Sequence, residues 1–255
     1  MLAQTAPAHA AISLIAEDVS LQPGRTQWIG LLFEMEPGWH VYWVNPGDAG
    51  DPPRPTWTLP PGFRAGAIRW PVPTRLVIGP VVDYGYEGRV LLALPLDVPA
   101  GFTPSATVSL SADLRYLICR DVCIPGRTKV SLPTLLSGDA AKSAGRRDLF
   151  TETRARWAKT MPATWSVSAA TDGRQITVSL QTGTSESAVT FYPLEADQID
   201  NVAPQAVTPT ARGAQITLQR TDPDAPLPPL LKGVVVLGKD RAYEIAPALS
   251  GSSRR

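Results

Sequence analysis

Two cysteines, the only ones among the 255 residues, lie close together in the segment Cys119-Arg120-Asp121-Val122-Cys123. Three interpretations of this pair are open. Two reduced thiols would suit a cytosolic chain, although a free cysteine is usually buried alone among apolar side chains. Half of a metal site would need two further soft ligands, which only a partner could supply. A disulfide is the third interpretation, because a three-residue hairpin loop would bring the two Cβ atoms within bridging range.

If the bridge forms, its small ring favours a redox role over a structural one. The loop-closure model gives a five-residue ring roughly 2 kcal/mol of stabilisation, compared with about 3 kcal/mol for fifteen residues. A bridge that served stability would connect distant strands, as in immunoglobulin domains. A small ring is also easier for a partner's thiolate to open. Arg115, Arg120 and Arg127 lie nearby in sequence and could favour a thiolate, whereas Asp121 would oppose it.

Other common chemistries lack the residues that they need. The sequence has no Gly-rich phosphate loop between a strand and a helix, and no G-x-S-x-G elbow. The two histidines, His9 and His40, form no H-E-x-x-H pattern, so a histidine-built metal site is not expected. The 24 basic and 23 acidic side chains give a net charge of +1, which argues against nucleic-acid binding. We therefore expect no cofactor, no metal and no nucleic-acid partner.

The elements that must position the cysteines are predicted to be short strands. Apolar side chains recur at every second position over 29–35 and 108–114, and 90–96 and 128–132 are further strand candidates. Pro (26) and Gly (20) are abundant, which favours strands and turns over long helices. The segment 45–53 is rich in Pro, Gly and Asp and is predicted to be a loop. Short strands with such frequent turns are typical of an antiparallel β-sandwich.

The alternation stops over residues 138–160, where a helix is predicted. Phe150, Trp157 and Met161 would share one face of this helix, and Pro162 would end it. We expect the apolar face to pack on a sheet and the basic face to be solvated.

A second set of strands begins at Trp165, with a hairpin predicted around Asp172-Gly173. The predicted fold is therefore all-β, with two immunoglobulin-like antiparallel β-sandwich domains joined by a short helical linker. The expected boundaries are 1–137 for the first domain, 138–162 for the linker and 163–255 for the second domain.

Three sequence motifs are similar to those of a known family. They occupy, in order, Gly38–Gly50, Tyr84–Gly88 and Tyr116–Pro125. Together they resemble the periplasmic N-terminal (alpha) domain of the DsbD/ScsB family of transmembrane thiol:disulfide reductases. The resemblance is strongest to the ScsB-like branch, whose periplasmic part carries an additional immunoglobulin-like domain.

The resemblance implies that this chain is a protein-disulfide reductase module in an electron relay. A thioredoxin-like domain of the same membrane reductase would reduce the Cys119–Cys123 pair. The pair would then pass its electrons to periplasmic thioredoxin-fold proteins. Cys123 would form the mixed disulfide with partners, and Cys119 would resolve it. The implied location is the bacterial periplasm, tethered to the inner membrane, and the module is expected to be monomeric.

The resemblance also suggests which residues surround the pair. Family members close a cap loop over the disulfide, and Leu76–Tyr86 occupies that position here. The implied lid residues are Asp83, Tyr84 and Tyr86. His40 and Tyr42 match positions near the active site of the family, and a strand would place both on one face.

The sequence also departs from the better-known alpha domains, which have five residues between the cysteines where this chain has three. The chain has no thioredoxin-like segment, so we expect it to be a domain excised from a longer membrane protein. Two other functions stay open. One is a secreted binding module whose disulfide only pins a hairpin, and the other is Cu(I) binding by the reduced cysteines.

Overall fold

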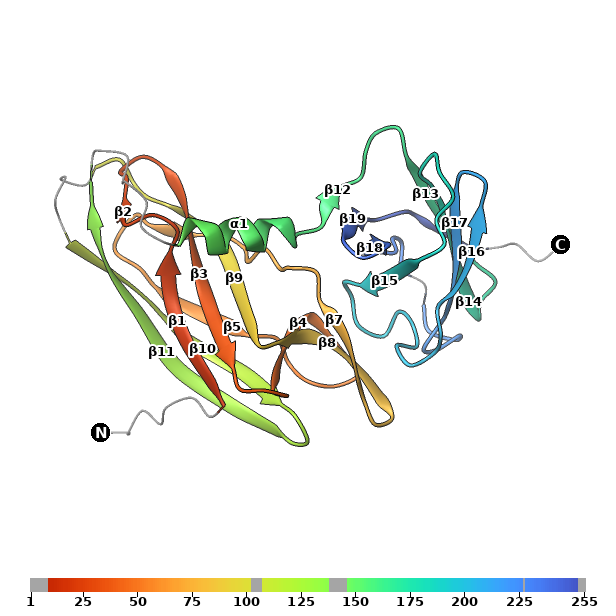
Figure 1. Ribbon diagram of the computed structural model, residues 1–255, viewed down its shortest axis with the longest axis horizontal. Helices are drawn as coiled ribbons and strands as arrows, with labels where there is room; N and C mark the ends of the chain where they lie inside the picture. The colour runs from red at the N-terminus through yellow and green to blue at the C-terminus, as the bar shows by residue number, and fades with distance from the viewer. Residues whose placement is uncertain (1–8, 102–106, 138–145, 227, 252–255) are drawn as a thin grey trace. The chain divides into compact units, whose positions relative to one another are not determined.

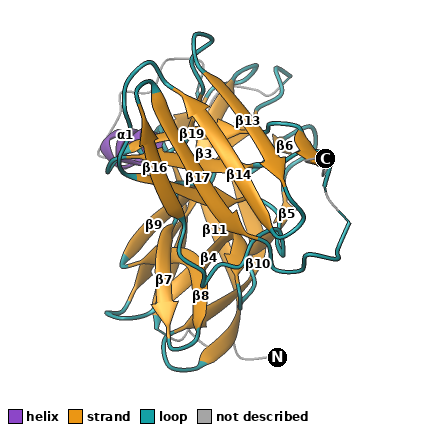
Figure 2. Cartoon of the chain, turned by 90° about the vertical axis from the view of Figure 1, so that its right-hand side faces the viewer, coloured by secondary structure: helices purple, strands orange, loops and turns teal. Residues whose placement is uncertain are grey.

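The computed structural model of the chain describes residues 9–101, 107–137, 146–226 and 228–251. In this part of the chain nearly all regular structure is β-strand, with one short helix (Figures 1 and 2). The predicted all-β fold class is therefore confirmed. The backbone forms two compact units, and neither is a single stretch of sequence. The first unit is Met1–Val44, Gly50–Thr74 and Gly85–Trp157, and the second is Asn45–Ala49, Arg75–Tyr84 and Ala158–Arg255.

Strands β1 to β11 form two sheets. One has the order β1-β3-β9-β6, and the other has the order β2-β11-β10-β4-β8-β7 with β5 paired to β10. The strands are β1 (Ala10–Ala16), β2 (Ser20–Leu21), β3 (Thr26–Met35), β4 (His40–Gly47), β5 (Arg54–Thr58), β6 (Arg64–Ala65), β7 (Thr74–Ile78), β8 (Val81–Glu87), β9 (Arg89–Asp97), β10 (Thr107–Cys119) and β11 (Cys123–Leu136). The predicted strands over 29–35, 90–96, 108–114 and 128–132 are confirmed within β3, β9, β10 and β11.

The long hairpin of β10 and β11 positions the cysteines. Its strands pair antiparallel from Thr107 opposite Leu135 to Cys119 opposite Cys123. Near the cysteine end, the ring of Tyr116 lies across Gly126. A Cβ atom at Gly126 would lie 2.2 Å from that ring. Glycine at this position leaves room for the Tyr116 ring to lie across the paired strands.

The prediction that 45–53 is entirely loop is wrong at its beginning. Strand β4 continues through Asn45, Pro46 and Gly47 before the chain turns. Gly47 makes this continuation possible, because its φ is +90° and a Cβ atom there would lie 2.4 Å from the carbonyl oxygen of Val82 in β8. The close approach of the two backbones thus depends on glycine.

Helix α1 (Arg147–Ala155) packs on β1 and β9, as its apolar face predicted. Phe150 is 1% exposed and lies in a cluster with Ile15, Leu91 and Ala93. Arg154 donates two hydrogen bonds of 2.6 and 2.7 Å to the carboxylate of Glu17. Helix α1 therefore belongs to the first unit. Residues 138–145 of the predicted helix lie outside the described residues.

The prediction that the helix continues to residue 160 is wrong, because the chain becomes extended after α1. Trp157 forms a β-bridge with Pro71, and β12 (Lys159–Thr160) pairs with β19. Met161 packs on the apolar core of the second unit instead of sharing a helical face with Phe150. Strand pairing thus ends the helix before Pro162 is reached.

Strands β12 to β20 form two further sheets, with the orders β12-β19-β18-β15 and β16-β17-β14-β13-β20. Their core includes Phe191, Ile216 and Val178, each fully buried. The predicted hairpin is confirmed, with Gly173 at a φ of +99° in its turn. Besides β12 the strands are β13 (Ser166–Thr171), β14 (Gln175–Gln181), β15 (Val189–Pro193), β16 (Ala206–Thr210), β17 (Gly213–Gln219), β18 (Gly233–Leu237), β19 (Arg241–Ile245) and β20 (Leu249–Gly251).

Most strand pairs are antiparallel, as predicted, but β2, β12 and β20 pair in parallel with their neighbours. These three strands have only two or three residues each. The domain boundaries 1–137, 138–162 and 163–255 stay a prediction. Among the described residues, no helix has the length and apolarity to cross a membrane.

Candidate active site

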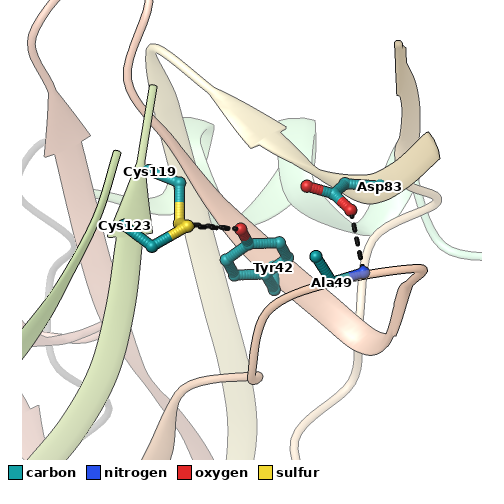
Figure 3. Close-up of a disulfide and its surroundings, with 5 residues drawn as sticks. All are labelled: Tyr42, Ala49, Asp83, Cys119 and Cys123. Carbon is teal, nitrogen blue, oxygen red and sulfur yellow. Dashed lines mark hydrogen bonds between the residues drawn. A yellow bond between two sulfur atoms is a disulfide. The ribbon is translucent and has the colours of Figure 1, made fainter. Parts of the chain in front are cut away.

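The two cysteines form a disulfide at the end of the β10–β11 hairpin (Figure 3). Cys119 is the last residue of β10, Cys123 is the first of β11, and the two lie directly opposite each other. Their Cα atoms are 4.1 Å apart and their sulfur atoms are bonded at 2.07 Å. The predicted three-residue hairpin loop between the cysteines is confirmed.

The two sulfur-bearing residues differ in exposure. Cys119 is 2% exposed, whereas Cys123 is exposed to solvent. The loop beside Cys123 is also open, since Val122 is 64% exposed. An incoming thiolate can therefore approach the Cys123 side of the bridge far more easily than the Cys119 side.

The hydroxyl of Tyr42, a residue of β4, contacts both sulfur atoms. It donates a hydrogen bond of 2.7 Å to Sγ of Cys119 and lies 3.4 Å from Sγ of Cys123 (Figure 3). The tyrosine is fully buried. Gly50, at a φ of +95°, packs so closely that a Cβ atom there would lie 2.2 Å from the Tyr42 ring. The hydroxyl is thus held in place, where it can stabilise negative charge on Cys119.

His40 shares this face of the sheet, as the sequence predicted. It lies opposite Cys119 in the strand register and is 2% exposed. Its ring meets the ring of Tyr42 edge to face, with centroids 5.2 Å apart. The structure therefore brings His40, Tyr42 and the two cysteines together. In the described part of the chain, no group of three or more His, Cys, Asp or Glu side chains is arranged to hold a metal.

Leu76–Tyr86, the segment that the resemblance placed as a cap loop, forms most of the hairpin of β7 and β8. Tyr86 belongs to the first unit and is buried, and its hydroxyl donates a hydrogen bond of 2.6 Å to the carbonyl of Pro71. Burial raises the pKa of the Tyr86 hydroxyl well above its usual value. This tyrosine is therefore a neutral donor at physiological pH.

Asp83 and Tyr84 belong to the second unit and are buried there. Asp83 accepts a hydrogen bond of 3.1 Å from the backbone of Ala49 (Figure 3). The Tyr84 hydroxyl donates one of 2.9 Å to the side chain of Asn201, and burial raises its pKa. Both residues thus help to hold segments of the second unit together. The lid role proposed for Asp83, Tyr84 and Tyr86 stays a prediction.

Two contacts of the site could not be predicted from the sequence pattern. Arg120, considered from the sequence only for its charge, lies with its guanidinium carbon 5.1 Å from the centre of the Trp39 ring. His9 stacks on the same tryptophan, with centroids 3.9 Å apart and planes 7° from parallel. Only the Gly38-Trp39 pair hinted at such packing, because glycine beside a large flat side chain leaves room for a neighbour.

Comparison with known families gives a match to the first part of the chain. Residues 13–135 match the family described as "Thiol:disulfide interchange protein DsbD, N-terminal". This range includes β4 and all but the last residue of the β10–β11 hairpin, with both cysteines. No curated protein sequence matches the chain.

Among solved structures, the N-terminal periplasmic domain of ScsB from Proteus mirabilis is similar over nearly its whole length. The TM-score is 0.69 at 20% sequence identity, and the match covers 96% of this chain and 95% of that one. The periplasmic chaperone SfaE is aligned over 95% of this chain and 100% of its own, but at 10% identity and a TM-score of only 0.23. The resemblance drawn from the sequence motifs is confirmed: residues 13–135 match the model of the DsbD N-terminal family, and the chain has the fold of the ScsB periplasmic domain.

Proposed function

We propose that this protein is a periplasmic thiol:disulfide exchange module that uses Cys119 and Cys123 as its redox pair. The observation that carries the proposal is the asymmetric disulfide, with Cys123 exposed, Cys119 buried and the Tyr42 hydroxyl on the buried sulfur. The match of residues 13–135 to the DsbD N-terminal family supports it. The module would act in the periplasm as part of a reductase anchored in the inner membrane.

Reduction of the module would begin at the exposed sulfur. A thiolate of a thioredoxin-like donor domain attacks Sγ of Cys123, and a new S–S bond forms while the Cys119–Cys123 bond breaks. The electron pair of the broken bond goes to Sγ of Cys119, which leaves as a thiolate beside the Tyr42 hydroxyl. The donor's second thiolate then attacks the donor's own sulfur in the mixed disulfide and releases Cys123. The module has gained two electrons and the donor holds a disulfide.

The reduced module would then pass the same two electrons to a periplasmic thioredoxin-fold protein. The Cys123 thiolate attacks the acceptor's disulfide, and the Cys119 thiolate resolves the mixed disulfide that results. The acceptor leaves as a dithiol and the Cys119–Cys123 bond is restored. His40 is proposed to help Tyr42 shape the environment of the buried sulfur, since it lies opposite Cys119 and against the Tyr42 ring.

The equilibrium reduction potential of the pair tests this proposal. The chain is equilibrated with graded dithiothreitol or glutathione buffers, and the free thiols are trapped and counted. We expect a potential between those of thioredoxin and protein disulfide isomerase, about −270 to −180 mV. A potential below about −300 mV would mark a structural bridge and favour the binding-module alternative.

Mixed-disulfide trapping tests the order of attack. The Cys119→Ser variant leaves the exposed Cys123 thiol without its resolving partner, so it should accumulate a mixed disulfide with an oxidised thioredoxin-fold protein. The matched Cys123→Ser variant leaves only the buried Cys119 and should trap far less. Equal trapping by the two variants would contradict the assignment of Cys123 as the attacking cysteine.

A further inference from the structure

The loop between the two cysteines is docked onto the β3–β4 turn by one side chain. The guanidinium of Arg120 lies over the Trp39 ring, 5.1 Å from its centre. The aliphatic stem of Arg120 passes over Gly38, where an added Cβ atom would be 3.2 Å from its Cδ. Arg120 is still half exposed, with 52% of its side chain accessible to solvent. Its position therefore reflects a specific contact and not general burial.

The surface that receives Arg120 is itself held firmly. Trp39 is 4% exposed, and the imidazole of His9 stacks on it at 3.9 Å. His9 is tied to Glu36 twice, by a side-chain contact of 2.6 Å and by a backbone hydrogen bond of 3.0 Å from the Glu36 amide. The Trp39 amide donates to the Glu36 carbonyl at 3.1 Å. The turn thus presents the indole as a rigid platform.

The charge of Arg120 is largely occupied by its neighbour. Its Nε donates a hydrogen bond of 2.9 Å to the carboxylate of Asp121, which follows it in the loop. An arginine paired in this way exerts less long-range attraction on a nearby thiolate than an unpaired one.

We propose that Arg120 is a positioning residue that favours the disulfide state of the Cys119–Cys123 pair by docking the loop on Gly38 and Trp39. The proposal rests on the redox role of the pair. In the oxidised protein the S–S bond already requires the closed loop, so the docking contact forms in full. In the reduced protein the loop is free to open, and the contact is made only part of the time. Docking therefore stabilises the oxidised state more than the reduced state.

The test is the equilibrium of each variant with dithiothreitol, measured by thiol trapping on the full chain. An exposed cation–π contact corresponds to about a two- to fivefold change in an equilibrium constant. We expect Arg120→Ala to lower the equilibrium constant for disulfide formation by about this factor, so that the pair becomes easier to reduce. Arg120→Lys, which keeps a cation and an aliphatic stem, should restore most of the loss.

Arg127→Ala is the matched control, because it removes an equal charge from the same hairpin without touching Trp39. Arg127 is 72% exposed and lies 3.6 Å from Asp113. The Arg127→Ala substitution should leave the equilibrium constant for disulfide formation unchanged. Circular dichroism and thermal unfolding of each variant show that the fold is retained.

Two results would overturn the inference. An unchanged equilibrium in Arg120→Ala would mean that the contact is equally present in both redox states. A shift in the opposite direction would mean that Arg120 acts by stabilising thiolate charge. The measurement needs only dithiothreitol, so its outcome is separate from whether the chain exchanges with thioredoxin-fold proteins. If the chain did not exchange with thioredoxin-fold proteins but the Arg120→Ala equilibrium still shifted, the proposed function would be rejected and the docking role of Arg120 would be kept.

Discussion

At the scale of single residues, the site separates two tasks that thiol exchange requires. Cys123 is accessible and can be attacked, whereas Cys119 is buried and must accept the electron pair when the bridge opens. Burial alone disfavours a charged sulfur and would make Cys119 a poor leaving group. The Tyr42 hydroxyl, 2.7 Å from the Cys119 sulfur, offsets this effect by donating a hydrogen bond to the developing thiolate.

Removing that hydroxyl should slow reduction of the disulfide. Hydrogen bonds to charged groups contribute about 1.5–3 kcal/mol, so Tyr42→Phe should reduce the rate by roughly tenfold or more. The pKa of the Cys119 thiol should rise in the reduced protein. Stopped-flow reduction by dithiothreitol across a pH series measures both effects.

Tyr86→Phe is the control for this experiment, because Tyr86 is equally buried and donates its hydrogen bond to the Pro71 carbonyl instead of a sulfur atom. The disulfide of Tyr86→Phe should be reduced by dithiothreitol at the wild-type rate. Equal slowing in both variants would show that loss of any buried hydroxyl loosens the domain, and the role given to Tyr42 would then be wrong.

At the scale of elements, the active site depends on the β10–β11 hairpin staying paired to its tip. The strands are fully paired over thirteen residues of β10, and the cysteines are the last pair. Tyr116 packs edge to face on Phe33 of β3, with ring centroids 5.9 Å apart. The same ring lies across Gly126 of β11, so the side chain that anchors the hairpin also requires glycine on the opposite strand.

A methyl group at position 126 should therefore weaken the hairpin. In Gly126→Ala the Cβ atom would overlap the Tyr116 ring, and such overpacking costs about 1–3 kcal/mol. Urea unfolding should show this loss of free energy. Hydrogen exchange should speed up in β10 and β11 near the cysteines.

Gly101→Ala is the matched control, since a Cβ atom at Gly101 would have no heavy atom within 4 Å. Its free energy of unfolding should be close to that of the wild type. A Gly126→Ala protein as stable as this control would show that Tyr116 moves aside without cost, and that the glycine is not needed for pairing.

At the scale of the whole molecule, a strand was easier to predict from the sequence when only one of its faces is buried. A strand buried on one face alternates, as β17 does with buried Ile216 and Leu218 and more exposed residues between them, and such strands were predicted. Strands β4 and β8 are buried along most of both faces and lack this alternation. The end of β4 was predicted to be a loop because 45–53 is rich in Pro, Gly and Asp, and most of β8 lies in the segment that the resemblance placed as a cap loop.

The same distinction applies to the site. The spacing of Cys119 and Cys123 was sufficient to predict the hairpin loop, because the geometry of such a loop is local. The contact of Arg120 with Trp39 joins residues that are some eighty positions apart in the chain. No local pattern encodes a contact of that kind, so only the charge of Arg120 could be considered from the sequence.

The stability of the second unit should depend on pH through one buried carboxylate. Glu186 is 5% exposed and accepts a hydrogen bond of 2.6 Å from Arg241, which holds the pKa of Glu186 below its usual value. A carboxyl whose pKa is lower in the folded state stabilises the fold above its unfolded pKa of about 4.3. That contribution is lost as the pH falls through the lower, folded-state pKa.

Glu186→Gln should therefore destabilise the second unit at pH 7 by about 1.5–3 kcal/mol, the range for a hydrogen bond to a charged group, and the difference should shrink below about pH 4. Hydrogen exchange of the β17 and β18 amides at the two pH values measures this locally. Glu244→Gln removes the same charge from an exposed position of β19 and should have little effect at either pH. If the loss in Glu186→Gln were equally large at pH 7 and pH 3.5, the packing of the side chain and not its ionised hydrogen bond with Arg241 would be the source of the stability.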